Sequence, residues 1–424
     1  MDTQNKKSGN VAAICTMFAL FFMIAFVTNF AGSMAVVAKN QFNASATASQ
    51  LGSAANFFAY LFMGIPGGLI LKRKGYKFTA LLAAAVGFIG LGIQLASGYV
   101  PASDNPFYVY IVGAFVAGFS MCLLNLVVNP LLNTLGGGGN KGNQLVQMGC
   151  SLNSVGATLA PMILGWLIGG EMDKATVSKV APAMLIAMAL FAVAFVIVLV
   201  SKIPEPHLET EEERADRLSG KTNVIKDIVA TLKFRHFTLG ALAIFFYITI
   251  ESGIPNMANL YMSDMKEVGP AVAGSVVAIY WFAMMIGRIV GGAVGGKVSS
   301  RTMITALSLL GIVSLLAMMF MPVKFVTVFG KTIPLSMCLL FVCGISTSVM
   351  WGGLFNLAAE GLGKYVPMGS GIFMACVFGG VCLPLQGMLA GKIGYLGSYW
   401  FTIALFAYIF VYANFMSKPQ KRAE

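Results

Sequence analysis

A succession of long apolar runs determines what this chain can fold into. Crossing a bilayer as an α-helix takes about 20 predominantly apolar residues. The sequence contains twelve such runs, near residues 12–36, 49–71, 78–98, 107–134, 145–169, 180–201, 237–262, 270–293, 302–322, 334–360, 367–391 and 397–416. Helices and closed barrels are the structures that satisfy every backbone polar group in lipid, and these runs are too long for barrel strands. The sequence therefore predicts an all-α membrane protein with twelve transmembrane helices.

The composition excludes the other broad classes. Of the 424 residues, 58% are hydrophobic and 10% are charged, whereas soluble domains carry about 25% charged residues. So few charges cannot cover a soluble enzyme or keep a chain disordered. The net charge of +12 does not indicate a nucleic-acid partner, because the basic residues lie between apolar runs and form no single patch. The expected partner of this surface is the lipid bilayer.

The basic residues also predict the orientation. Loops on the cytoplasmic side of a membrane carry an excess of Lys and Arg. Placing the N-terminus in the cytoplasm puts about three quarters of the 28 Lys and Arg residues on that side. We therefore expect a multi-pass protein of the bacterial inner membrane with both termini in the cytoplasm.

One charged segment divides the chain into halves. Residues 202–236 contain seven acidic and seven basic side chains, which predicts a cytoplasmic linker between a bundle at 1–201 and a bundle at 237–424. The halves look like repeats: Asn129–Gly136 aligns with Asn356–Gly363, and Pro161 with Pro384, at nearly the same offset. Internal repeats of this kind are typical of transporters. The sequence thus favours two pseudo-symmetric six-helix bundles.

Several motifs resemble one transporter family. The loop PGGLILKRKGYK (residues 66–77) is similar to the short basic loop of the major facilitator superfamily. The stretches NLVVNPLLNTLG (125–136), SLNSVGATLAP (151–161) and FNLAAEGLGKYVPMGSG (355–371) resemble its fucose and glucose/galactose symporter family. The neutral Asn125, where the fucose branch carries a carboxylate, is more similar to the glucose/galactose branch.

This resemblance implies a secondary active transporter that imports a neutral, hexose-like sugar by alternating access, coupled to H⁺ or Na⁺. The alternative is a uniporter or a carrier of another small polar solute. An enzyme is not expected, because no nucleophile–base set or metal cluster occurs in the sequence. We expect a monomer without cofactor, resident metal or nucleic-acid partner.

Glu251 is the candidate for ion coupling. It lies about fifteen residues into the seventh run and is the single acid placed deep inside a span. A carboxylate there persists where it pairs, takes a proton or binds a cation such as Na⁺. Gly253 and Pro255 follow it and can free backbone carbonyls. Direct contact with substrate and a purely structural role remain the alternatives.

Neutral amides and indoles form the candidate sugar site. Amides offer donors and acceptors without a charge, and an indole can stack on a sugar ring. The alternatives are hydrogen bonds between helices for the amides and lipid-facing packing for the indoles. The predicted substrate-binding residues are Asn29, Asn125, Asn129, Asn153, Asn256, Trp281, Trp351 and Asn356.

Arg288 and Glu360 complete the predicted set. Both lie near the expected cytoplasmic ends of their runs. Opposite charges there are costly alone and tolerated as a pair. We predict an ion pair at the cytoplasmic gate, with two separately solvated charges as the alternative.

Overall fold

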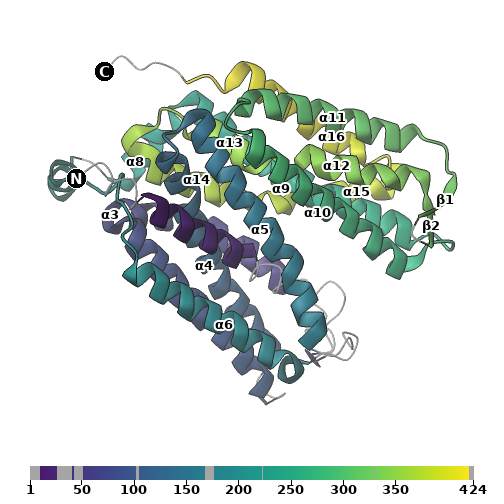
Figure 1. The fold of residues 1–424 in the computed structure, drawn as a ribbon, viewed down its shortest axis with the longest axis horizontal. Helices are drawn as coiled ribbons and strands as arrows, with labels where there is room; N and C mark the ends of the chain where they lie inside the picture. The colour runs from purple at the N-terminus through teal and green to yellow at the C-terminus, as the bar shows by residue number, and fades with distance from the viewer. Residues whose placement is uncertain are drawn as a thin grey trace. The chain divides into compact units, whose positions relative to one another are not determined.

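The computed structural model describes residues 10–25, 41–42, 51–101, 105–167, 176–221, 223–328 and 330–419. These residues form two compact units (Figure 1). Unit 1 comprises residues 1–135, 152–231 and 362–375; unit 2 comprises 136–151, 232–361 and 376–424. The boundary at 231/232 lies within the predicted linker, but each unit also includes a short segment from the other half of the chain.

The described part of every predicted apolar run coincides with helical structure. Within the described residues, nine helices are long and apolar enough to cross a membrane. One of them, Ala54–Tyr99, holds two of the predicted runs, and the shorter helix Asn10–Ala25 covers the described part of the first. The fifth run falls on α5 (Gly139–Leu167). The predicted all-α membrane fold is therefore confirmed.

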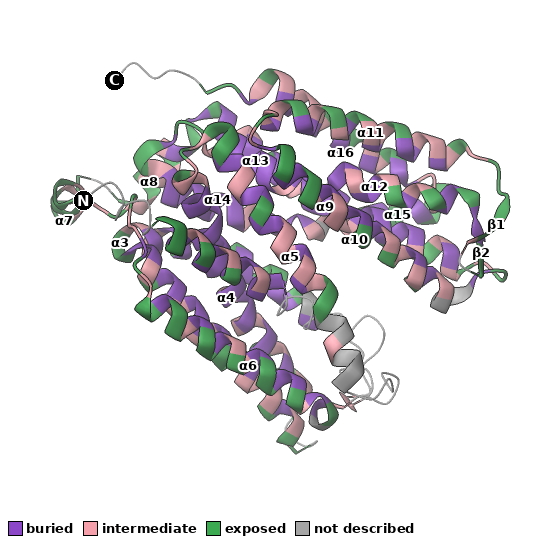
Figure 2. Ribbon diagram, in the orientation of Figure 1, coloured by how far each residue is buried: buried purple, intermediate pink, exposed green. Residues whose placement is uncertain are grey.

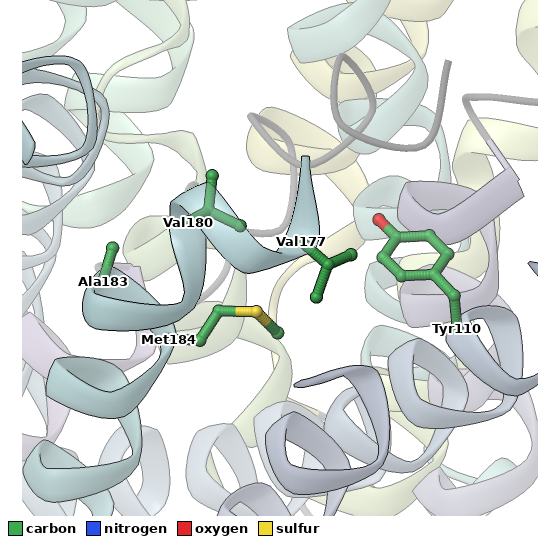
Figure 3. Packing of buried hydrophobic residues seen from close by; sticks show 5 residues of the cluster. All are labelled: Tyr110, Val177, Val180, Ala183 and Met184. Carbon is green, nitrogen blue, oxygen red and sulfur yellow. The ribbon is translucent and has the colours of Figure 1, made fainter. Parts of the chain in front are cut away.

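Unit 1 is built around α3 (Leu51–Ala96) and α4 (Pro106–Leu135). The short helix η1 (Ser97–Tyr99) ends α3, and α6 (Val177–Val200) packs beside α3. Figure 3 shows Tyr110 of α4 next to Val177, Val180, Ala183 and Met184 of α6, all buried. These apolar contacts join the fourth and sixth predicted spans.

Glycines bring α14 (Val366–Ala375) against α3 inside unit 1. A Cβ atom on Gly64 would lie 2.6 Å from the carbonyl oxygen of Gly371, and a Cβ on Gly371 would lie 2.6 Å from the carbonyl oxygen of Gly64. The two backbones are thus too close for any side chain between them. The short helix η5 (Gly363–Tyr365) leads into α14.

Unit 2 contains the remaining spans: α9 (Arg235–Ser263), α10 (Gly269–Val294), α11 (Ser300–Phe320), α15 (Leu383–Ile393) and α16 (Tyr399–Val411), which continues as the π-helical turn η7 (Tyr412–Met416). The tenth run is divided into η4 (Leu335–Leu339), α12 (Leu340–Thr347) and α13 (Met350–Ala359). The 3₁₀ segment η6 (Cys376–Cys382) precedes α15. A hairpin that the hydropathy pattern did not predict, β1 (Phe325–Val328) with β2 (Lys331–Pro334), joins α11 to η4.

The linker forms two short helices, α7 (Glu211–Leu218) and α8 (Val224–Leu232). Thr210 begins α7 with a capping box, in which its hydroxyl accepts from the N–H of Glu213 and the Glu213 carboxylate accepts from the N–H of Thr210. The segment before α7 lies against the turn at Gly75, which interrupts α3 with a φ of 83°. The carboxylate of Glu205 accepts there from the N–H groups of Tyr76 and Lys77.

Apolar side chains cover the outer faces of the spans. On α6, Leu185, Val193, Val196 and Val200 are all exposed, whereas α4 is buried along most of its second half (Figure 2). An apolar surface of this extent is unfavourable in water and suits the hydrocarbon core of a bilayer. The fold thus presents the surface that the composition predicts.

Candidate functional site

Glu251 lies in the middle of α9, and two donors hold its carboxylate. The hydroxyl of Tyr247, one helical turn earlier, donates to Oε1 at 2.6 Å. Nη2 of Arg288, on α10, donates to the same oxygen at 3.1 Å. The two charged side chains are 16% and 12% exposed. A membrane span tolerates opposite charges in this arrangement, paired with each other and hydrogen-bonded.

Pro255 opens the backbone at this point. A helical carbonyl accepts from the N–H four residues later, and proline has none. The carbonyl of Glu251 therefore lacks its regular donor, and the hydroxyl of Tyr280 from α10 donates to it at 3.1 Å. Tyr280 also shares a hydrogen bond of 3.0 Å with Thr347, the last residue of α12. Three helices thus meet at Glu251.

The interruption between α12 and α13 supplies a further acceptor. The carbonyl of Ser348 lies in this interruption and accepts from Nε of Arg288 at 3.4 Å. The next carbonyl, that of Val349, accepts from Nε2 of Gln147 in α5 at 2.7 Å. Arg288 therefore bridges a carboxylate on α9 and a backbone oxygen that the broken helix exposes. Broken helices at membrane depth are typical of the ion sites of transporters.

The geometry leaves one oxygen of Glu251 available. Both donors reach Oε1, and within the described ranges no protein donor reaches Oε2. A proton bound to this carboxylate would cancel its charge and leave Arg288 without its counter-charge. Proton binding and separation of the pair are therefore linked by charge balance alone.

The predicted gate pair differs from what the structure contains. Arg288 pairs with Glu251 instead of Glu360. Glu360 follows the end of α13 and is exposed. Its carbonyl oxygen, not its carboxylate, contacts Nε2 of His236 at 2.7 Å. In this structure Arg288 contacts the carboxylate in the middle of α9, and its pairing with Glu360 at the cytoplasmic gate stays a prediction.

The amides of α4 form a second polar cluster, in unit 1. Nδ2 of Asn125 contacts the hydroxyl of Tyr60 on α3 at 2.9 Å. Nδ2 of Asn129 donates to the backbone carbonyl and side-chain oxygen of Asn125 at 2.9 and 3.2 Å. Asn125 is 6% exposed and Asn129 is fully buried. The predicted asparagines of α4 are therefore joined by hydrogen bonds to each other and to α3. Their contact with a sugar stays a prediction.

The remaining predicted sugar-binding residues are in different environments. Asn153 is half-buried and donates to the backbone carbonyl of Phe21 at 3.2 Å. Asn356 is buried and donates to Ser300 of α11 at 2.9 Å, a bond between two helices. Asn256 is exposed. Asn29 lies outside the described residues. For all of these residues sugar binding remains a prediction.

The two candidate indoles also differ. Trp281 is 46% exposed and packs edge-on against Tyr280, with ring centroids 5.2 Å apart. It is therefore one contact away from Glu251, through the hydroxyl of Tyr280. Trp351 is half-buried in the first turn of α13, just after the interruption that holds Arg288. Both lie in unit 2.

Sequence reasoning identified Glu251 but missed the side chains that hold it. Tyr247 precedes Glu251 by four residues, and the i, i+4 spacing on one helix face could have revealed it. Tyr280 comes from another helix and carries no such signal. Within the described ranges, no three His, Cys, Asp or Glu side chains lie close enough to share a metal ion.

Comparison with known proteins gives a consistent set of relatives. A sequence profile of the Major Facilitator Superfamily matches residues 16–385. The glucose/galactose transporter of Brucella abortus is 29% identical, over 96% of this chain and 94% of that protein. The L-fucose-proton symporter of Escherichia coli is 23% identical, over 98% and 96%. A crystal structure of the E. coli fucose:proton symporter matches with a TM-score of 0.80 at 19% identity, covering 97% of this chain and 100% of that one.

Proposed function

Because the chain belongs to the major facilitator superfamily, we propose that it is a secondary active symporter that imports a neutral hexose together with a proton. Membership makes it a multi-pass membrane transporter and not an enzyme, as the sequence predicted. Its higher identity to a glucose/galactose transporter than to a fucose symporter supports a sugar of the glucose or galactose type. The names of both relatives support sugar as the substrate class, and the second supports H⁺ as the coupling ion.

The observation that carries the proposal is the Glu251–Arg288 pair. It is a nearly buried ion pair inside two apolar spans, beside a helix interruption. Ionisable residues inside membrane spans are rare, because removing them from water is costly, and they mark ion pathways. In the proposed cycle the pair separates when Glu251 takes a proton and forms again when the proton leaves.

The proposed sugar contacts are neutral groups in each unit. In unit 2 they are Asn256, Trp281, Trp351 and Asn356, and in unit 1 they are Asn29, Asn125, Asn129 and Asn153. A sugar hydroxyl that displaces Tyr60 from Asn125 would exchange one neutral hydrogen bond for another, so the protein loses little on binding. The indole of Trp281 offers a flat apolar surface for a pyranose ring.

The proposed location is the bacterial inner membrane, with both termini and the linker in the cytoplasm. The distribution of Lys and Arg supports this orientation. We further propose two six-helix bundles, at 1–201 and 237–424, that act as a monomer and alternate in access.

The test is uptake by the purified full-length protein in lipid vesicles. Labelled glucose, galactose, fucose and xylose are offered under an imposed proton gradient, an imposed sodium gradient, or neither. The proposal predicts accumulation of glucose or galactose above the external concentration with the proton gradient alone. Accumulation with the sodium gradient alone would show that the coupling ion is Na⁺ and not the proton. Equilibration without accumulation would indicate a uniporter, and transport of none of these sugars would refute the substrate class.

A further inference from the structure

Helix α8 leaves an apolar face uncovered outside the spans. Its apolar residues recur at helical spacing on one side, at positions 224, 225, 228, 229 and 232. Ile225 is 71% exposed, Val229 47% and Leu232 40%. A helix of nine residues with such a stripe loses free energy in water unless the stripe is covered.

The other side of α8 already packs on the protein. Thr231 is fully buried. Asp227 is half-buried and accepts from Nζ of Lys72 at 3.0 Å. In a helix, successive residues are turned by about 100°, so Thr231 and Asp227 lie together on one side and Ile225, Val229 and Leu232 on another. The apolar stripe is therefore not the face that holds α8 to the rest of unit 1.

Two attachments place α8 at a membrane surface. Lys72 lies where the second apolar run ends. At the other end of α8, the carbonyl of Leu232 accepts from the hydroxyl of Thr238 in the first turns of α9 at 2.7 Å. The span α9 begins at Arg235, three residues after α8 ends, and three residues reach about 10 Å at most. The helix is thus tied at two points to the ends of apolar spans.

The charges beside the stripe match one kind of surface. Lys226, Lys233 and Arg235 are exposed, and among the described residues none of them has an acidic partner. The one acid of α8, Asp227, is paired with Lys72. The ammonium of Lys226 also donates to the carbonyl of Lys221 at 2.8 Å. Exposed cations beside an apolar stripe are typical of helices that lie in the interface of an anionic membrane.

We propose that α8 is an interfacial helix. Its stripe of Ile225, Val229 and Leu232 lies in the boundary between headgroups and acyl chains of the leaflet that α9 enters. Lys226, Lys233 and Arg235 bind anionic lipid headgroups. The connection between the two halves of the transporter would then be anchored to the membrane and respond to its charge.

The test uses single-cysteine variants of the full-length protein at positions 224–232, each carrying a spin label. The exposed Cys15 and Cys338 are replaced by alanine, and this background without an added cysteine is labelled in parallel. Collisions with oxygen report lipid, and collisions with an aqueous nickel complex report water. Glu212→Cys and Leu218→Cys on the polar helix α7 are the matched controls, and Leu218 is itself 73% exposed.

In vesicles that contain phosphatidylglycerol, Ile225→Cys, Val229→Cys and Leu232→Cys should lose nickel collisions and gain oxygen collisions with a helical period. Both α7 controls should stay in water. Adding Lys226→Gln and Lys233→Gln, or replacing the anionic lipid by phosphatidylcholine, should restore nickel access at position 229. Because these side chains are exposed, the variants should fold as the parent does.

Three results would overturn the proposal. Equal nickel access on α7 and α8 would show a solvated stripe. Spin–spin broadening that grows with the ratio of protein to lipid would show that a second copy covers it. Oxygen and nickel collisions at α8 that are the same in phosphatidylcholine vesicles would show that anionic lipid does not bind the helix.

Discussion

A single proline explains why α9 can hold its charge site. Pro255 leaves the carbonyl of Glu251 without its helical donor, and Tyr280 replaces that donor at 3.1 Å. The same residue therefore presents an anionic side chain and a free backbone oxygen to α10. Arg288 and Tyr280 lie on α10 two turns apart and each contacts one of these groups. The local sequence creates the polar site and the neighbouring helix satisfies it.

Arg288→Gln should destabilise the protein strongly. It leaves the Glu251 carboxylate nearly buried without its cation, and breaking such a pair costs about 3–5 kcal/mol. The double variant Arg288→Gln with Glu251→Gln removes both charges and should recover much of this loss. The measurement is the midpoint of thermal unfolding in detergent for both single variants and the double variant. Purely additive losses would show that the two side chains do not interact.

Glu360→Gln is the matched control for this cycle. Glu360 is exposed and its carboxylate is not paired with Arg288. Its removal should change the unfolding midpoint little, and by the same amount with or without Arg288. A coupling between Arg288 and Glu360 larger than that between Arg288 and Glu251 would contradict the observed geometry.

Glu251 could be predicted from the sequence because an acid inside an apolar run is visible in one dimension. Its partner could not, because Arg288 is 37 residues away on another helix. The pairing depends on the register in which α10 packs against α9, and no local sequence pattern specifies that register. The hydrogen bond of Asn356 to Ser300 was hidden for the same reason.

At the scale of elements, close approach of backbones replaces side-chain packing between α3 and α14. Gly64→Ala and Gly371→Ala each place a Cβ 2.6 Å from a backbone oxygen. Overpacking of this kind costs about 1–3 kcal/mol, so both variants should unfold at lower temperature and transport more slowly. Gly387→Ala in α15 is the control, because nothing lies within 4 Å of its added Cβ. Equal behaviour of all three variants would contradict the observed contact.

The docking of the linker on α3 should weaken in acid. Burial lowers the pKa of His207, and its Nδ1 contacts the hydroxyl of Tyr76 at 2.6 Å. The undocked histidine, with a pKa of about 6.5, binds protons more readily than the docked one. Docking is therefore fully stable above about pH 6.5 and loses stability as the pH falls through that value toward the lowered pKa.

Hydrogen exchange of residues 203–209 measures this effect. After correction for intrinsic exchange rates, these residues of the wild type should exchange faster at pH 6 than at pH 7.5. The variant His207→Gln should remove that dependence on pH. Burial raises the pKa of Glu205, opposed by the N–H donors of Tyr76 and Lys77. This carboxylate therefore acts with the opposite sign, weakening docking as the pH rises above about 4.3. The difference between the two proteins isolates His207, and an unchanged pH profile would refute its role.

The spans were predictable as elements because their length and apolar content suffice to identify them. The interruption at Ser348 was not, since the sequence there contains neither proline nor a charge. The hairpin Phe325–Val328 with Lys331–Pro334 was likewise missed, because short strands give a weak pattern beside a strong hydrophobic one.

At the scale of the whole molecule, the compact units depart from the two halves of the chain at two short segments. The two compact units exchange residues 136–151 and 362–375 across the two halves of the chain. Hydropathy carries no information on this exchange, because it identifies apolar stretches and not the contacts that they make. Contacts such as that of Gly371 with Gly64 depend on three-dimensional approach alone.

The proposed topology makes a direct prediction. A reporter fused within residues 211–218 or after Lys418 should report the cytoplasm, and one inserted in the turn between β1 and β2 should report the opposite side. The asymmetry of Lys and Arg is the physical reason. A reporter at either cytoplasmic position that reads as external would refute the orientation.

We propose that Glu251 couples proton entry to sugar accumulation, and the variant Glu251→Gln tests this coupling. Glutamine keeps the shape and most hydrogen bonds but cannot exchange a proton. Uphill accumulation of labelled galactose or glucose in vesicles with a proton gradient should disappear, while exchange of sugar at equal concentrations, which needs no net proton movement, should continue. Full accumulation by Glu251→Gln, at the ratio reached by the wild type, would contradict the account.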